Sequence, residues 1–119
     1  MKVPVIFDSE YRFCLVLWEV EPIKCARLAD VCKERLGWSR TTTYTVIKRL
    51  CDRGVLKNEN SVVTSIISKE QAQISEYKQM MEKKFEGSLP AFIAAFSKCN
   101  KLKEDDAEAL RRIIESAGK

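Results

Sequence analysis

Residues 39–53 decide how this chain folds, and they read Ser-Arg-Thr-Thr-Thr-Tyr-Thr-Val-Ile-Lys-Arg-Leu-Cys-Asp-Arg. Four side chains recur at i, i+3, i+4 and i+7, the spacing of a helix that buries one stripe: Thr43, Val46, Ile47 and Leu50. We expect a cap at Ser39 and a stop at Gly54. The opposite face is short, polar and basic, and it offers Arg40, Thr41, Tyr44, Thr45 and Lys48. Because hydroxyls and cations near a helix N-terminus suit base edges and phosphates, DNA recognition is the leading hypothesis.

The positive charge of the chain is concentrated around the same helix. The formal net charge is +4, and residues 37–57 carry five cations against the single anion Asp52, so this segment holds the whole excess. A basic segment of this kind is compatible with nucleic-acid binding and equally with a solvated helix face. Charge alone therefore leaves both interpretations open. The five cations are Arg40, Lys48, Arg49, Arg53 and Lys57.

The flanking segments predict a winged helix-turn-helix over residues 1–67. A first helix should begin near a cap at Asp8 or Ser9 and end at Pro22, and a second should cover residues 24–36. After Gly54, the β-rich residues 55–57 and 62–67 flank a turn at 58–61 and predict a hairpin. Three helices followed by a hairpin describe a mainly α fold with a small β wing, whose third helix enters the major groove. The stripe predicted to be buried in the first helix comprises Tyr11, Cys14, Leu15 and Trp18.

Residues 68–119 predict a C-terminal region of three helices. Ser68 and Gln71 should form a capping box, Ser88 should start the middle helix and the last helix should follow Leu102. We expect this region to pair with a second copy of the chain, because its apolar side chains are numerous for a segment without its own sheet. Covering the winged domain of the same chain is the alternative. The side chains assigned to the dimer contact are Tyr77, Met81, Phe85, Leu89, Phe92, Ile93, Phe96, Leu110 and Ile114.

Composition argues against an enzyme. At 119 residues the chain fits one domain or two very small ones. It has no histidine and no Gly-rich phosphate loop, and the acidic cluster at residues 104–106 is explained by the helix dipole. We expect no cofactor and no small-molecule substrate. No stretch is apolar enough to act as a signal core or to span a bilayer, which predicts a cytoplasmic protein.

The five cysteines do not predict a metal site. They are scattered without a Cys-x-x-Cys pair, whereas zinc ligands usually cluster at tight spacing. Cys25 and Cys32 lie seven residues apart on an apolar helical face, where buried thiols act as small hydrophobes. Cys99 is expected in a loop, which makes it the more reactive thiol.

Several short motifs, in order along nearly the whole chain, resemble the penicillinase-repressor family, which includes the BlaI and MecI repressors, with the CopY repressors as relatives. Residues 8–11, 17–18 and 22–23 are similar to its first-helix signature of Asp-x-Glu-Trp, Leu-Trp and Pro-Ile. Trp38-Ser39, Thr42, Thr45, Arg49-Leu50 and Gly54 resemble its recognition-helix pattern Trp-Ser-Pro-Lys-Thr-Val-x-Thr-Leu-Ile-x-Arg-Leu. Residues 87–89 and Phe96 resemble the Gly-Ser-Leu and Asn-Phe of its C-terminal half.

The resemblance implies a homodimeric transcriptional repressor that binds double-stranded DNA at an inverted-repeat operator. By position, Thr41, Thr42, Tyr44 and Thr45 would face the groove, while Ser39, Arg40, Lys48 and Arg49 would hold phosphates or structural contacts. The chain departs from the pattern at Arg40, where the family often has proline, and at Thr41, where it often has lysine. The wing is short and carries only Lys57 near its tip.

The resemblance also suggests how repression could be relieved. In antibiotic-responsive members a membrane sensor protease cuts an Asn-Phe bond, which corresponds here to Ala95-Phe96, and control of β-lactam resistance genes is the implied role. A cut there would remove the last helix and weaken the dimer's bivalent grip on DNA. The other interpretation of Phe96 is a core aromatic. No cluster of cysteines follows Cys99, so the resemblance is to BlaI and MecI rather than to the copper-responsive members.

A second class of function stays open from the sequence alone, a winged-helix module that binds a protein and never touches DNA. The polar face of Thr41, Thr45 and Lys48 argues against it, because the core of a protein interface would present large aromatic side chains.

Overall fold

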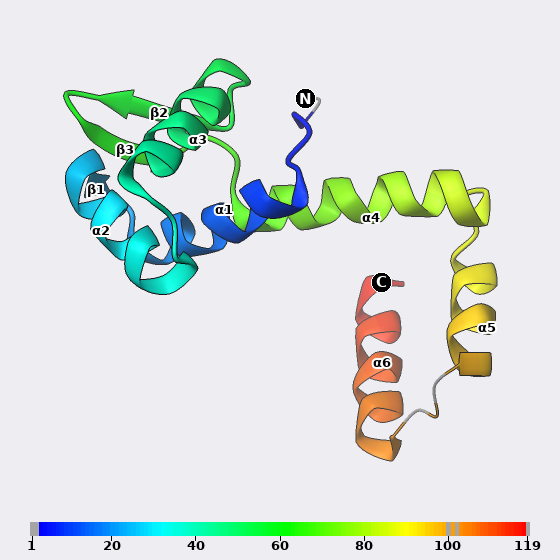
Figure 1. Cartoon of the computed structure of the whole chain (residues 1–119). Helices are drawn as coiled ribbons and strands as arrows, with labels where there is room; N and C mark the ends of the chain where they lie inside the picture. Colours follow the sequence, from blue (N-terminus) through cyan, green and yellow to red (C-terminus); the bar gives the residue numbers. More distant parts are fainter. Residues whose placement is uncertain (1–2, 100, 102, 119) are drawn as a thin grey trace. The chain divides into compact units, whose positions relative to one another are not determined.

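The computed structural model describes residues 3–99, 101 and 103–118. The chain divides into two compact units, residues 1–76 and residues 77–119, and each is described by itself. In chain order the elements are α1 (Asp8–Val20), β1 (Ile23–Lys24), α2 (Cys25–Leu36), α3 (Arg40–Asp52), β2 (Leu56–Glu59), β3 (Val62–Ser65), α4 (Lys69–Phe85), α5 (Leu89–Cys99) and α6 (Glu104–Ala117) (Figure 1).

The sheet of the first unit has three antiparallel strands in the order β1-β3-β2. In the hairpin, Asn58 pairs with Val63 and Glu59 with Val62, so the turn consists only of Asn60 and Ser61. These two residues have φ of 54° and 65°, as a two-residue hairpin turn requires to match the twist of its strands. The turn predicted over residues 58–61 was therefore too long. The third strand, β1, was missed, because two residues are too few to show alternation.

The first helix begins where it was expected, but the predicted cap was wrong and the predicted stripe was right only in part, since Cys14 is buried. The N-cap position is Phe7, and the Glu10 carboxylate accepts a hydrogen bond of 3.0 Å from the Phe7 N–H. Leu15 is exposed, and Tyr11 and Trp18 are only half-buried. The sequence of α1 allows two alternative buried stripes. The one that is buried in the structure contains the charged Glu10, so the sequence favoured the other, which is entirely uncharged. The residues that α1 buries are Glu10, Phe13, Cys14, Val16 and Leu17.

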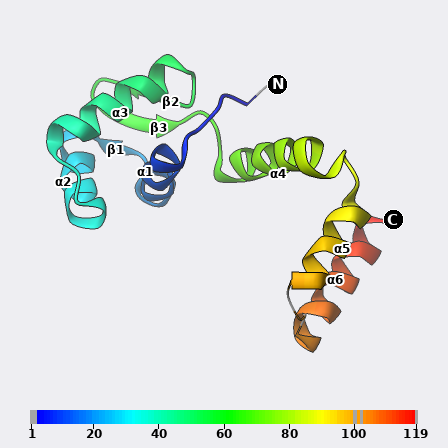
Figure 2. The same cartoon turned by 45° about the vertical axis from the view of Figure 1, so that its right-hand side comes forward.

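The core of the first unit lies between α1, α2, α3 and the sheet (Figures 1 and 2). The side chains of Phe13, Leu17, Leu28 and Leu50 are fully buried in it, and the Phe13 ring stacks on Trp38 with centroids 5.9 Å apart. Ala72, near the start of α4, is buried against the same core. This packing holds α3 by one stripe and leaves its other face free.

Polar contacts tie the end of the sheet to α1. The Glu21 carboxylate accepts hydrogen bonds from the Ser65 N–H at 2.8 Å and from the Ser65 hydroxyl at 2.9 Å. Nε1 of Trp18 donates to the carbonyl oxygen of Ile67 at 3.0 Å. The wing is thereby fixed to the helices at its base.

The helices of residues 68–118 begin where the sequence predicted. The Gln71 side chain accepts from the Ser68 N–H at 2.9 Å, and the Ser68 hydroxyl accepts from the Gln71 N–H at 3.0 Å, which confirms the capping box. Gly87, with φ of 76°, follows the end of α4, and the Ser88 hydroxyl accepts from the Ala91 N–H at the start of α5. Leu102 lies outside the described residues.

The cysteines are all free thiols. Burial raises the pKa of Cys14 to about 12 and also raises the pKa of Cys32. Cys99 is exposed as expected, but it is the last residue of α5 rather than part of a loop, because α5 continues one turn beyond its apolar residues.

Candidate nucleic-acid interface

The third helix has the cap and the buried stripe that the sequence predicted. The Ser39 side chain accepts a hydrogen bond of 3.1 Å from the Thr42 N–H, and Arg53 is the C-cap. All four stripe residues are buried: Thr43, Val46, Ile47 and Leu50. The side chains expected to contact DNA are exposed, which is the arrangement that binding requires.

Helical geometry divides the exposed face of α3 into a centre and two flanks. Thr41, Thr45 and Lys48 follow one another at i, i+4 and i+7 and lie opposite the buried stripe. Arg40 and Tyr44 form the flank that meets α2, because Arg40 contacts α2 directly. Arg49, with Thr42, lies on the other flank. The resemblance had grouped Tyr44 and Thr42 with Thr41 and Thr45 as groove-facing, whereas Tyr44 and Thr42 lie on opposite flanks of this face.

The threonine hydroxyls on this face differ in their remaining hydrogen-bonding capacity. The Thr45 hydroxyl donates to the Thr41 carbonyl at 2.9 Å, so its oxygen is left as an acceptor. The Thr42 hydroxyl accepts from the Ser39 hydroxyl at 2.9 Å and belongs to the cap. Among the described residues no partner contacts the Thr41 hydroxyl, so this group can both donate and accept toward a ligand.

The guanidinium of Arg40 is held by three groups from two helices. Nη2 donates to Oδ1 of Asp30 at 2.7 Å, while Nη1 donates to the Tyr44 hydroxyl at 3.1 Å and to the Ala26 carbonyl at 3.5 Å. The contacts with Tyr44 and Asp30 raise the pKa of Arg40, so the guanidinium stays charged. Sequence reasoning missed Asp30, because no spacing rule links residues on two different helices.

Arg53 has a structural role rather than a free charge. Its guanidinium forms an ion pair with the Glu10 carboxylate, donates to the Val5 carbonyl at 3.1 Å and lies 5.3 Å from the centre of the Phe7 ring. Burial alone would raise the pKa of Glu10, but the hydrogen bonds from Arg53 and Phe7 and the charges of Arg53 and Arg49 hold that pKa below its usual value. The sequence did indicate that Glu10 is buried, because Glu10 lies three, four and seven residues before the buried Phe13, Cys14 and Leu17.

Two of the five cations of the segment form no ion pair with a described residue. Arg40 is paired with Asp30, Arg53 with Glu10, and Lys57 of the wing with Glu59 at 3.6 Å. Lys48 and Arg49 are exposed and form no ion pair with any residue that the structure describes. The charge excess read from the sequence is therefore focused on these two side chains.

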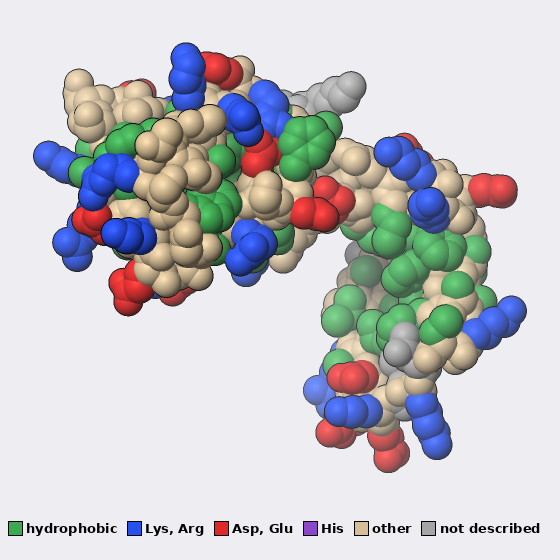
Figure 3. All heavy atoms as spheres, viewed as in Figure 1, with side chains coloured by type: hydrophobic (Ala, Val, Ile, Leu, Met, Phe, Trp, Pro, Cys, Tyr) green, Lys and Arg blue, Asp and Glu red, His purple; other side chains and the backbone are tan. Residues whose placement is uncertain are grey.

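The apolar side chains assigned to a dimer contact fall into two groups. Met81 is buried, and the Phe85 and Phe92 rings are in edge contact with centroids 5.3 Å apart. The other group is exposed, and Figure 3 shows hydrophobic side chains gathered over α5 and α6. It comprises Tyr77, Leu89, Ile93, Phe96, Leu110 and Ile114, and the structure adds Met80 and Ile113.

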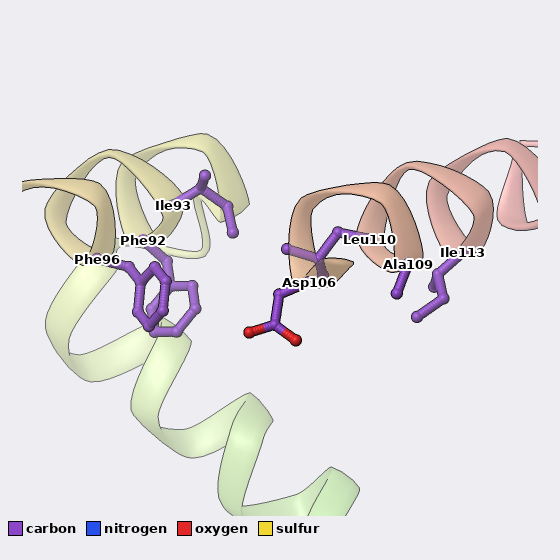
Figure 4. Close-up of a pocket in the computed structure, with 7 residues that line it drawn as sticks. All are labelled: Phe92, Ile93, Phe96, Asp106, Ala109, Leu110 and Ile113. Atoms are coloured by element: carbon purple, nitrogen blue, oxygen red, sulfur yellow. The ribbon is translucent and has the colours of Figure 1, made fainter. Parts of the chain in front are cut away.

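A cavity of about 380 Å³ opens between α5 and α6, neither of which has a buried residue. Phe92 and Phe96 of α5 point into this space, as do Asp106 and Ile113 of α6 (Figure 4). Ala95 and Phe96, the bond named above for cleavage, lie within α5 and are exposed.

The described residues contain neither a metal-binding cluster nor a membrane-spanning helix. No group of three or more Cys, Asp or Glu side chains there could hold a metal ion. Nor does that part of the chain contain a helix with the length and apolarity needed to cross a membrane.

The first unit has three helices and a small antiparallel sheet, and the third helix is capped and has an exposed polar face. These features are consistent with the winged-helix class of regulatory proteins. Comparison with protein families agrees, because the model of the penicillinase repressor family matches residues 6–116. The chain belongs to this family of regulatory repressors, which indicates a role in transcriptional repression. No match was found among curated proteins.

Proposed function

We propose that this protein is a homodimeric repressor in the cytoplasm that binds an inverted-repeat DNA operator through the exposed face of α3. The observation that carries the proposal is that α3 has two distinct faces: a buried stripe fixes the helix, while Thr41, Thr45 and Lys48 are exposed on the opposite side. Hydroxyl groups suit base edges, and an unpaired lysine suits phosphate. Lys48 and Arg49 supply the sequence-independent attraction.

The dimer is proposed from the exposed apolar surface of α5 and α6. Ile113 and Ile114 are 63% and 66% exposed, which is unusual for neighbouring large apolar side chains on one helix. A contiguous apolar surface of this kind marks an interaction site. A second copy is the occupant that fits the rest of the proposal, because two-fold symmetry would present two copies of α3 to the two halves of a palindrome.

Control of β-lactam resistance genes by a sensor protease is the finer form of the proposal. Cleavage between Ala95 and Phe96 would separate α6 from the rest of the chain and remove half of the apolar surface. Phe96 lines the cavity between α5 and α6, which supports a packing role for it instead. Mass spectrometry of the protein from cells exposed to a β-lactam would distinguish the two, since only cleavage yields a fragment that begins at Phe96.

The DNA-binding proposal is tested with a labelled duplex from the upstream region of the protein's own gene across a series of salt concentrations. We expect a steep fall of log affinity with log salt, and binding to an unrelated duplex weaker by at least about a thousandfold. Lys48→Glu should weaken binding strongly. Lys33→Glu, an equal charge change on the exposed side of α2, should have a much smaller effect.

Weak binding to every duplex with a flat salt dependence would contradict the proposal. It would favour the alternative, a winged-helix module that binds only a protein partner. In that case a partner captured by the wild-type chain should still bind after charge reversal at Arg40 and Lys48.

A further inference from the structure

Arg40 is the first residue of α3, and its contacts are unusual for an exposed side chain. An exposed arginine normally samples many rotamers, and an exposed ion pair contributes little to stability. Here the guanidinium has three partners: the Asp30 carboxylate and the Ala26 carbonyl on α2, and the Tyr44 hydroxyl one turn along α3. Partners on two helices restrict its orientation more than one ion pair could.

The three contacts do not use all of the hydrogen-bonding capacity of Arg40. A guanidinium carries five N–H donors. Nη1 donates to Tyr44 and Ala26, and Nη2 donates once, to Asp30. The Nε–H and one N–H of Nη2 are left, and these lie on adjacent nitrogens of one planar group. Two donors in a fixed plane match two oxygens of a phosphate.

The position of Arg40 on the helix favours a phosphate over a base. Thr41, Thr45 and Lys48 occupy the line opposite the buried stripe, whereas Arg40 lies on the flank beside α2. A flank residue at the helix N-terminus lies where the DNA backbone passes when the centre of the helix faces the groove. Free N–H groups at the same helix end also favour an anion.

We propose that Asp30 and Tyr44 are positioning residues that hold the Arg40 guanidinium ready to clamp one DNA phosphate through its two remaining donors. This inference rests on the proposed function, since it assigns a contact within the same interface. Asp30 lowers the local positive charge, so it would be unfavourable near DNA if it did nothing else. Its benefit is orientation, because a side chain already held loses less conformational entropy when it binds.

The test uses the full-length protein and a duplex selected by the wild-type chain from a randomised pool. Asp30→Asn is compared with Glu19→Gln, which removes an acid from another exposed ion pair, Arg35–Glu19. Both variants gain one positive charge, so general attraction to DNA rises equally in both. We expect Asp30→Asn to bind the selected duplex about tenfold more weakly than Glu19→Gln does, and to lose a similar factor on an unrelated duplex, because a phosphate contact carries no sequence information.

Two further variants separate positioning from charge. Arg40→Lys keeps the charge but loses the planar fork, so affinity for the selected duplex should fall about tenfold while the salt slope stays the same. Adding Asp30→Asn to Arg40→Lys should cause no further loss, because Asp30 acts only through Arg40. Tyr44→Phe should reproduce part of the loss.

Three results would overturn the inference. If Asp30→Asn binds the selected duplex as well as or better than Glu19→Gln does, Asp30 competes with DNA instead of positioning Arg40. If Arg40→Lys changes the preference at a single base pair only, Arg40 reads a base and not a phosphate. If the two losses add in the double variant, Asp30 does not act through Arg40. A wild-type chain that selects no duplex at all contradicts the proposed function before any variant is compared.

Discussion

The two units of this chain treat their apolar side chains in opposite ways. In residues 1–76 a core of large apolar side chains, including Phe13 and Leu28, has no exposed surface, although Phe7 and Ile66 of this unit are exposed. In residues 77–119, Ile113 and Ile114 are each more than 60% exposed, and α5 and α6 have no buried residue. The sheet of the first unit gives its helices a second surface to pack against, whereas the described residues of the second unit form helices without a sheet. This contrast is the basis of the proposal that the second unit packs against a second copy of the chain.

The largest loss of stability is expected from a substitution in the core of the first unit. Phe13→Ala should reduce the free energy of unfolding by about 4 kcal/mol, because it removes a fully buried ring stacked on Trp38 and leaves a cavity. Urea unfolding followed by tryptophan fluorescence measures the loss. Leu15→Ala, on the exposed side of the same helix, should cost less than about 1 kcal/mol. Equal losses would mean that the core is not where the structure places it.

The next prediction concerns the association of the second unit with a second copy of the chain. Ile114→Glu should raise the dissociation constant of the dimer at least about a hundredfold, because two-fold symmetry places the new charge in the contact twice. Sedimentation at several concentrations measures it. Ile66→Glu, at a comparably exposed isoleucine of the first unit, is the matched control and should leave association unchanged. A wild-type chain that is monomeric at micromolar concentration would contradict the proposed dimer.

A smaller loss of stability is expected when the ion pair between Glu10 of α1 and Arg53 at the end of α3 is broken. Glu10→Gln should cost about 2 kcal/mol near neutral pH, since it leaves Arg53 without its buried partner. The pKa of Glu10 is held below its ordinary value of 4.5, so its stabilisation is complete above pH 4.5 and is lost as pH falls through the lowered pKa.

The measurement for this pair is the free energy of unfolding between neutral pH and pH 3. Wild type should lose more stability on acidification than Glu10→Gln does. Glu19→Gln, which breaks an exposed pair with Arg35, should change stability little at any pH in this range. Parallel pH profiles for wild type and Glu10→Gln would show that Glu10 does not contribute through its charge.

Prediction from sequence worked best where local spacing carries the information. The stripe of Thr43, Val46, Ile47 and Leu50 was found because a helix repeats every 3.6 residues whatever lies around it. The caps at Ser39 and Ser68 were found because a side chain bonds an N–H two or three residues away. The prediction of the buried stripe of α1 was only partly right, because the charged Glu10 lies among the buried apolar residues and made that face look exposed.

By itself, then, the sequence determined the order of the helices, the bounds of α3 and which of its faces would be free, since these depend on neighbours along the chain. Only the tertiary structure decided that β1 joins β3, that Arg53 pairs with Glu10 and that Arg40 is held by Asp30. Each of these contacts joins residues at least ten positions apart on different elements, where no periodicity links them. Such contacts form only after the core has brought the elements together, because they join segments that are distant along the chain.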